Sequence, residues 1–160
     1  TKMKKIDLID VVNSVVEDFN SDLSNSNKKI EININNSNLN GSKLNVLGVE
    51  SKLEQIIANL LDNAVSFSPT GSKISVICSI KKQNVQLIIE DEGPGFNEKN
   101  INRVFDRFYS NRPEKFGEHS GLGLNIVKNI VELHGGSIIA SNQLKNKKGA
   151  RIEVLLPIYK

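Results

Sequence analysis

The chain has 160 residues, of which 38% are hydrophobic and 24% charged, and its formal net charge is +3 at pH 7. This length suits one domain with one core over 1–160, and so small an excess of scattered positive charge argues against nucleic acid and against direct membrane contact. The sequence contains neither an apolar run long enough to span a bilayer nor a signal peptide.

The N-terminal half is predicted to combine two amphipathic helices with short strands. Apolar residues recur at helical spacing in the first and last of its segments, and Ile30, Ile32 and Ile34 alternate with polar residues between them. The predicted elements are a helix over 7–20, a polar loop over 21–27, a strand around 30–34, a loop over 36–42, a short strand over 44–47 and a helix over about 51–67.

The C-terminal half is predicted to hold two pairs of strands around one helix. The elements are strands over 73–81 and 84–91 joined by Lys82-Gln83, a break over 92–96, a short helix within 100–108, a mobile polar segment over 110–120, a helix over 123–134 and strands over 137–141 and 151–158. Gly135-Gly136 fits the end of the helix. Cys78, the single cysteine, lies in an apolar strand, which predicts a buried thiol in a reducing cytoplasmic setting. Strands joined by hairpins imply antiparallel pairing, so the order predicts an α+β two-layer sandwich.

The helix over 51–67 carries two adjacent stripes of different character. Its apolar stripe, which faces the predicted sheet, consists of Leu53, Ile56, Ile57, Leu60, Leu61 and Ala64. Beside it, Gln55, Asn59, Asn63 and Ser66 form a polar stripe. The two asparagines therefore point the same way, either toward water and a neighbouring loop or toward a hard cation such as Mg²⁺, which prefers oxygen ligands. The helix alone does not decide between these interpretations.

The stretch "EDEGPGF" over 90–96 ends an apolar strand with a carboxylate and two glycines. Asp91 is placed to accept a hydrogen bond from an exocyclic amine, and Gly93 and Gly95 permit a flat ligand to approach closely. An ordinary turn at the end of a strand has the same composition, so this motif is weak by itself.

The stretch "HSGLGLNIV" over 119–127 places Gly121 and Gly123 just before a helix. The N–H groups at a helix N-terminus bind phosphate oxygens, especially where no side chain covers them. The spacing fits neither the P-loop nor the dinucleotide-binding fingerprint.

Taken together, the motifs resemble the ATP-binding catalytic domain of bacterial sensor histidine kinases, within the wider superfamily of gyrase, Hsp90 and MutL. The resemblance covers nearly the whole chain through "NLLDNA", "DEGPGF", "VFDRFY", "SGLGL" and "IVKNIVELHGG". Within the family it looks most like ChvG-type sensors of alphaproteobacteria. The family fold implies a mixed, mostly antiparallel sheet with about three helices on one face and a flexible ATP lid, here over about 97–120.

The resemblance also implies roles for individual residues, with ATP and Mg²⁺ as the ligands. Asn63 and Asn59 would hold the metal, Asp91 would bind the adenine amino group, and Phe67 would stack on the base or sugar. The remaining nucleotide-binding residues that it implies are Gly93, Gly95, Ser120, Gly121, Leu122, Gly123 and Leu124.

The lid adds further expectations. Phe105 and Phe108 match aromatic anchors of the lid, which we expect mainly to pack it against the core. Many family members have a lysine at the position of Ser66, and here its phosphate contact is missing. The lid cations Arg107, Arg112 and Lys115 are candidates for phosphate contacts, and we expect Arg112 or Lys115 to compensate for the missing lysine.

Neither histidine of the chain fits a phosphoacceptor, because His119 precedes Ser120 and His134 precedes Gly135 rather than an acidic residue. We therefore expect a monomeric piece of a longer protein, which also fits a start at Thr1 without Met. Its partners would be its own dimerisation domain, which carries the phosphoacceptor histidine, and the receiver domain of a response regulator. The whole protein would be a homodimeric inner-membrane sensor with this domain in the cytoplasm.

Two other functions remain open at this stage. One is another ATPase of the same superfamily, such as an anti-sigma serine kinase, although "VFDRFY" argues against it. A gyrase- or MutL-type ATPase would need a following domain to supply a lysine. The other is a degenerate domain that only binds partners, which the complete set of motif residues argues against.

Overall fold

The computed structural model describes residues 2–36, 39–97, 99, 101–106, 122–143 and 147–160. In chain order its elements are β1 (Lys4–Asp7), α1 (Leu8–Ser24), β2 (Glu31–Asn35), β3 (Asn45–Gly48), α2 (Glu50–Phe67), β4 (Lys73–Lys81), β5 (Asn84–Glu90), the 3₁₀ helix η2 (Ile101–Phe105), α3 (Leu122–Leu133), β6 (Ser137–Asn142) and β7 (Ala150–Pro157). Among the described helices, none combines the length and the apolar character that crossing a bilayer requires.

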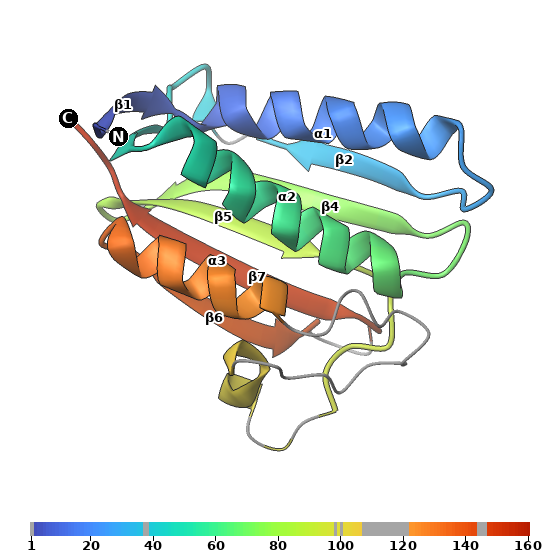
Figure 1. Ribbon diagram of the computed structural model, residues 1–160. Coiled ribbons are helices and arrows are strands. Elements are labelled where there is room, and N and C mark those ends of the chain that lie inside the picture. Colours follow the sequence, from blue (N-terminus) through green and yellow to red (C-terminus); the bar gives the residue numbers. More distant parts are fainter. Residues whose placement is uncertain (1, 37–38, 98, 100, 107–121, 144–146) are drawn as a thin grey trace.

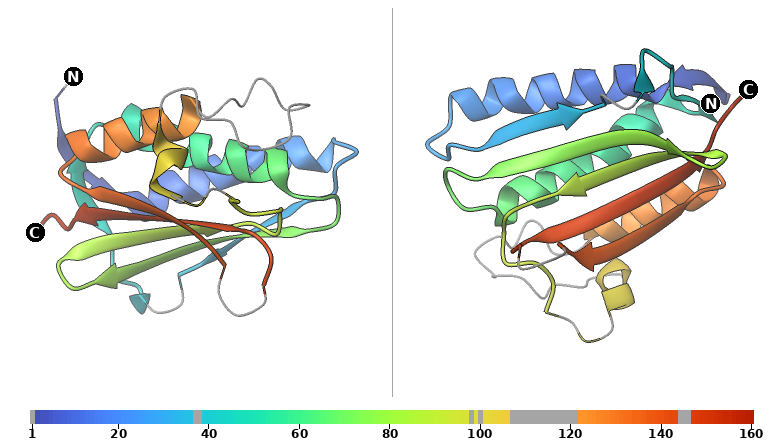
Figure 2. Two further views of the ribbon diagram at one scale, coloured as in Figure 1. Left: turned by 90° about the horizontal axis from the view of Figure 1, so that it is seen from below. Right: turned by 180° about the vertical axis from the view of Figure 1, so that it is seen from behind.

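The main sheet has five strands in the order β2-β4-β5-β7-β6 within the described residues. The pair β2–β4 is parallel, whereas β4–β5, β5–β7 and β6–β7 are antiparallel. Helices α1, α2 and α3 all lie on one face of this sheet, as the view along its edge makes plain (Figures 1 and 2). The predicted two-layer sandwich with a mixed, mostly antiparallel sheet is therefore confirmed. The parallel pair arises because β3 and α2 cross over between β2 and β4.

The core lies between the helices and the sheet. The apolar stripe predicted for α2 is buried throughout, and Leu53, Ile57 and Leu61 are at most 1% exposed. Cys78 points into the same core from β4, as predicted, and burial raises the pKa of its thiol from 9.0 to about 11. The thiol is therefore protonated and inert in the folded protein at neutral pH.

Two predictions about the N-terminal segment were wrong. The short strand β1 was missed; it pairs antiparallel with β3 in a separate two-stranded sheet. Only Ile6 of its four residues is buried, so no alternating pattern marks it. Helix α1 also continues to Ser24, beyond the predicted end at Asn20, because Leu23 extends its apolar stripe and packs against the core.

His134 joins the end of α3 to the start of α2. Its Nε2 accepts a hydrogen bond from the Val49 N–H at 3.2 Å, and its Nδ1 donates to the Ile130 carbonyl at 2.9 Å. A carbonyl only accepts and an amide N–H only donates, so both bonds require a neutral ring with its proton on Nδ1. The adjacent Gly135 has φ +77, which confirms the predicted end of the helix.

Candidate functional site

The polar stripe of α2 lies beside the buried one. Asn59 and Asn63 are half-buried, and neither side-chain amide hydrogen-bonds to another residue in the described part of the chain. We call Asn59 and Asn63 the asparagine face. Helix α2, which carries them, packs side by side with α3 (Figure 1). Half-buried amides without a protein partner take their hydrogen bonds from water or from a ligand.

At the C-terminal end of α2, serine hydroxyls donate hydrogen bonds to carbonyls of the same helix. Ser66 is buried, and its hydroxyl donates to the Asp62 carbonyl at 2.8 Å. Phe67 is also buried, at 7% exposure. It lines a cavity at this end of the helix.

Asp91 follows β5 directly and is only 3% exposed. Its Oδ1 accepts hydrogen bonds from the Gly93 N–H at 2.9 Å and from the Ala150 N–H at 3.1 Å. Its own N–H donates to the Ala150 carbonyl at 3.0 Å. These bonds fix the orientation of a buried carboxylate at the start of the segment 91–96, which we call the strand-exit loop.

The glycines of the strand-exit loop are required by close packing. A Cβ at Gly93 would lie 2.5 Å from the Phe67 carbonyl oxygen, so this loop and the end of α2 are in direct contact. Gly95 has φ +77, and a Cβ there would lie 2.6 Å from Oδ1 of Asn142. The contact between Gly93 and Phe67 brings Asp91 and the end of the asparagine helix into one site.

Sequence reasoning missed the residues that hold this loop from the β6–β7 connection. Asn142 accepts from the Phe96 N–H at 2.7 Å and donates to the Phe96 carbonyl at 2.9 Å. Gln143 donates to the Asp91 carbonyl, and Gly149 packs so closely that a Cβ would lie 1.7 Å from that same oxygen. No local motif marks these residues, because the partners of Asn142 and Gln143 lie 46 and 52 positions away along the chain.

A cavity of about 650 Å³ opens beside this contact. It is lined on one side by the end of α2, with Ser66 and Phe67, and on the other by Gly93 and Pro94. Lys28, from the α1–β2 connection, also lines it. The cavity therefore shares Phe67 and Gly93 with the site.

Gly123 stands in the first turn of α3. The helix begins at Leu122, and a Cβ at Gly123 would meet none of the described residues within 4 Å. Leu124 is buried in the main core, so its part in a site is limited to its backbone. Asn125 donates to the Phe105 carbonyl at 3.1 Å, and the Lys128 ammonium lies 5.8 Å from the centre of the Phe105 ring. The 3₁₀ helix is thereby tied to α3, and Phe105 packs in the core as expected.

The remaining predicted residues lie outside the described part of the chain. They are Arg107, Phe108, Arg112, Lys115, His119, Ser120 and Gly121. Of the other predicted residues, α2 carries Asn59, Asn63 and Phe67, and the strand-exit loop carries Asp91, Gly93 and Gly95. These two groups meet at the Phe67–Gly93 contact. The arrangement brings the end of the helix with the two asparagine amides against the loop with the buried Asp91 carboxylate.

Comparison with known proteins matches residues 48–160 to the family described as histidine kinase-, DNA gyrase B-, and HSP90-like ATPase. The sensor protein ChvG of Agrobacterium fabrum is 37% identical over 157 residues, which is 93% of this chain and 26% of ChvG. The sensor protein kinase PmrB of Pseudomonas aeruginosa is 35% identical over 146 residues, which is 90% of this chain and 29% of PmrB. The predicted likeness to ChvG-type sensors is confirmed, and the chain spans just over a quarter of the length of these relatives.

Solved structures give the same picture for the fold. The mycobacterial sensor histidine kinase MprB aligns with a TM-score of 0.77 at 30% identity, over 98% of this chain and 97% of that structure. A structure of full-length ShkA in complex with AMPPNP aligns with a TM-score of 0.78 at 25% identity, over 98% of this chain and 31% of ShkA.

Proposed function

This chain belongs to the histidine kinase-, DNA gyrase B- and HSP90-like ATPase family, as the ATPase domain of a sensor histidine kinase, and we propose that it presents Mg-ATP to a histidine on a separate dimerisation domain. The observation that carries the proposal is the contact between Gly93 and the Phe67 carbonyl. It holds the loop that carries a buried, oriented carboxylate against the end of the helix that carries the buried Phe67 ring.

Adenine recognition follows from that contact. Asp91 is held through Oδ1 by two backbone N–H groups, so the carboxylate is already oriented before a ligand arrives. A preorganised acceptor of this kind binds the adenine amino group at little cost in entropy. Phe67 stacks against the base or the sugar, and the glycines allow a flat ring to approach the backbone.

The asparagine face fits a magnesium ion. The amide oxygens of Asn59 and Asn63 are hard ligands on one side of one helix, and their amides have no partner among the described residues. A bound Mg²⁺ would neutralise charge on the phosphates of ATP. Asn63 is the principal ligand in this proposal, and Asn59, one turn earlier, acts directly or through water.

The chain's own contribution to phosphoryl transfer is positioning and charge stabilisation. The N–H groups at the start of α3, with Gly121, Gly123, Leu122 and Leu124 in the G-L-G-L segment, receive phosphate oxygens, and Ser120 assists them. The lid cations Arg107, Arg112 and Lys115 supply positive charge, and Arg112 or Lys115 replaces the lysine missing at Ser66. The general base and the phosphoacceptor histidine belong to the dimerisation domain.

The setting of the domain is part of the same proposal. The relatives are named as sensor proteins, and this chain spans just over a quarter of their length. We place it in the cytoplasmic part of a homodimeric inner-membrane sensor that passes its phosphoryl group to the receiver domain of a response regulator. The domain by itself is monomeric in this proposal.

A calorimetric titration with ADP, with and without magnesium, tests the binding step. We expect heat of binding with ADP and tighter binding when magnesium is present. Absence of both heat and a thermal shift would instead favour a degenerate, partner-binding domain.

A labelling experiment tests the transfer step. Incubated alone with γ-labelled ATP, the chain is expected to incorporate little label, whereas a dimerisation domain added with it becomes labelled on histidine. Rapid labelling of the isolated chain, or transfer to a serine of a partner protein, would contradict the proposal.

A further inference from the structure

Helix α2 ends without a basic residue of its own in its last turn. The carbonyl oxygens of the last turn of a helix have no partner within the helix, and the helix dipole places partial negative charge on them. The Ala64 carbonyl is satisfied by Ser68, through both its N–H and its hydroxyl. The next two carbonyls need partners from elsewhere in the chain.

Lys28 supplies them from the connection between α1 and β2. Its ammonium donates to the Val65 carbonyl at 2.6 Å and to the Ser66 carbonyl at 3.3 Å. The donor and the acceptors lie 37 and 38 positions apart in sequence. A cation at the C-terminal end of a helix is stabilised both by these bonds and by the dipole.

The backbone around Lys28 is held in place on both sides of this bond. The Lys28 N–H donates to the Ser26 hydroxyl at 2.9 Å. The neighbouring segment is tied to the α2–β4 connection, where the Gly71 N–H donates to the Lys29 carbonyl and the Glu31 N–H donates to the Ser72 carbonyl. Lys28 is half-buried, and these bonds hold its backbone beside the end of α2.

Lys28 binds the carbonyls of Val65 and Ser66, and the next residue, Phe67, is the one that contacts the strand-exit loop. Phe67 follows Ser66, and its carbonyl oxygen packs against Gly93, whose N–H donates to Asp91 Oδ1 at 2.9 Å. A shift of the last turn of α2 therefore displaces both the Phe67 ring and the loop that orients the Asp91 carboxylate. Lys28 and Phe67 also line the same cavity.

From these contacts we propose that Lys28 is a positioning residue for adenine recognition, acting by clamping the last turn of α2. The inference rests on the proposed function, because it concerns the residues that we assign to the base. Lys28 does not touch the nucleotide in this account; it acts through Phe67, Gly93 and Asp91. The Ser66 side chain cannot clamp the last turn of α2 to another element, because its hydroxyl donates to the Asp62 carbonyl within the same helix.

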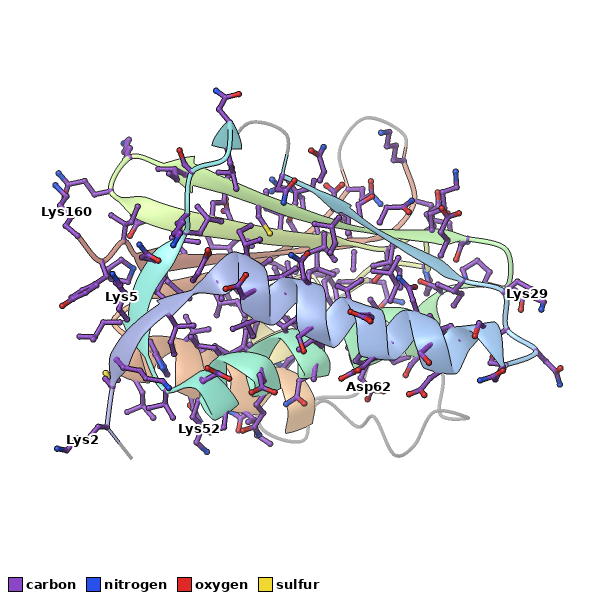
Figure 3. The ribbon with its side chains drawn as sticks, turned by 90° about the horizontal axis from the view of Figure 1, so that it is seen from above. Lys2, Lys5, Lys29, Lys52, Asp62 and Lys160 are labelled. Carbon is purple, nitrogen blue, oxygen red and sulfur yellow. The ribbon has the colours of Figure 1, made fainter. Side chains whose placement is uncertain are left out.

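The test compares Lys28→Met with Lys29→Met in the full chain. Both variants remove one positive charge and keep an unbranched side chain, but Lys29 is exposed at the turn between α1 and β2 (Figure 3). We expect Lys28→Met to weaken Mg-ADP binding about fivefold, and Lys29→Met to leave it unchanged. Lys28→Arg should restore most of the affinity, because a guanidinium also donates to carbonyls.

The preference for ADP over a nucleotide with another base shows whether Lys28 positions the base-binding residues or only stabilises the fold. Inosine diphosphate has a carbonyl where ADP has the amino group, so a well-placed Asp91 disfavours it. We expect the preference for ADP over inosine diphosphate to fall in Lys28→Met and to stay at the wild-type value in Lys29→Met. If Lys28→Met does not fold, Lys28→Gln is compared with Lys29→Gln in the same way.

The outcomes are distinguishable. Equal affinity and equal selectivity of the Lys28 variant and its Lys29 control, with wild-type binding intact, would overturn the role of Lys28 and leave the proposed function standing. A melting temperature lowered without any change in selectivity would also overturn it, since that result means a purely structural role. Failure of the wild-type chain to bind Mg-ADP would sink the proposed function itself.

Discussion

The strand-exit loop and the asparagine face form opposite sides of the proposed nucleotide site, and they differ in how much of their bonding the protein supplies. In the loop, Asp91 and Phe96 are bonded to residues at the end of β6, in the β6–β7 connection and at the start of β7, and Gly93 and Gly95 are packed against their neighbours. On the asparagine face, neither amide has a hydrogen-bond partner within the described residues. The start of α3 resembles the asparagine face, since no described residue lies within 4 Å of where a Cβ at Gly123 would stand.

This difference separates residues that are needed for both folding and binding from residues that are needed for binding alone. Residues of the strand-exit loop are needed to build the protein before any ligand arrives. Within the described residues, the asparagine face and Gly123 meet no such demand, and in the proposed site their chemistry serves the ligand. Substitutions that break the packing of the loop should therefore lower stability as well as affinity. A loop substitution that keeps these contacts, or one on the other side of the site, should lower affinity only.

The largest effect is expected for Gly149→Ala. A Cβ there would lie 1.7 Å from the Asp91 carbonyl oxygen, and φ is +137, so neither the backbone nor its neighbour can relax cheaply. We expect the free energy of unfolding to fall by about 4 kcal/mol. Gly71→Ala is the control: its φ is +88 but a Cβ meets nothing within 4 Å, so only backbone strain of about 1 kcal/mol remains.

Cys78 provides the measurement for this prediction. Burial raises the pKa of its thiol to about 11, so at about pH 8 it is labelled by thiol reagents only when the protein opens. A loss of about 4 kcal/mol raises the open population, and with it the labelling rate, about a thousandfold. A rate within tenfold of the Gly71→Ala rate would show that the loop is not as tightly built as the contrast requires.

The next effect is expected for Asp91→Asn. In the variant, Oδ1 still accepts from the Gly93 and Ala150 N–H groups, so the new amide nitrogen replaces the other carboxylate oxygen. The amide nitrogen and the adenine amino group are both hydrogen-bond donors, so they cannot bond to each other. We expect ADP affinity to fall about 100-fold, with the free energy of unfolding changed by less than about 1 kcal/mol. Glu92→Gln removes the same charge from an exposed neighbour and should bind ADP normally. Normal binding by Asp91→Asn would remove this residue from the site.

These two positions also mark how far sequence reasoning reaches. Asp91 was predicted because a carboxylate between an apolar strand and two glycines is a local pattern, as was the Lys82-Gln83 hairpin. The stripes of α2 were predicted because helical periodicity is local too. Gly149, Asn142 and Lys28 escaped prediction, because their roles depend on partners in distant parts of the chain, 37 positions away for Lys28 and 46 for Asn142.

The fold follows the same division. Antiparallel pairing was predictable where a short turn joins neighbours in sequence, as for β4–β5. Strand β1 was not, because its four residues bury only Ile6 and pair with β3, which lies beyond α1 and β2 in the chain. The family resemblance supplied the mixed sheet that periodicity alone did not give.

A smaller effect is expected for Gly123→Ala, and on affinity alone. Alanine is a better helix former than glycine, and its Cβ meets none of the described residues within 4 Å, so the free energy of unfolding should stay the same or rise by up to about 1 kcal/mol. The added methyl stands where phosphates would approach the helix N-terminus, so we expect ADP affinity to fall about tenfold. Adenosine, which lacks phosphates, should bind equally to both forms. A matching loss for adenosine would mean that Gly123 acts on the fold.

The smallest change in stability is expected for Asn63→Ala, and it tests the contrast most directly. No protein hydrogen bond is lost within the described residues, and alanine is the better helix former, so the free energy of unfolding should rise by about 0.5 kcal/mol. The tightening of ADP binding by magnesium should disappear, because an amide oxygen of the metal site is gone. Gln55→Ala, on the same polar stripe but two turns earlier, should gain similar stability and keep the magnesium effect. A loss of about 1 kcal/mol or more in Asn63→Ala would reveal a partner for its amide inside the protein, and the asparagine face would then be built like the strand-exit loop.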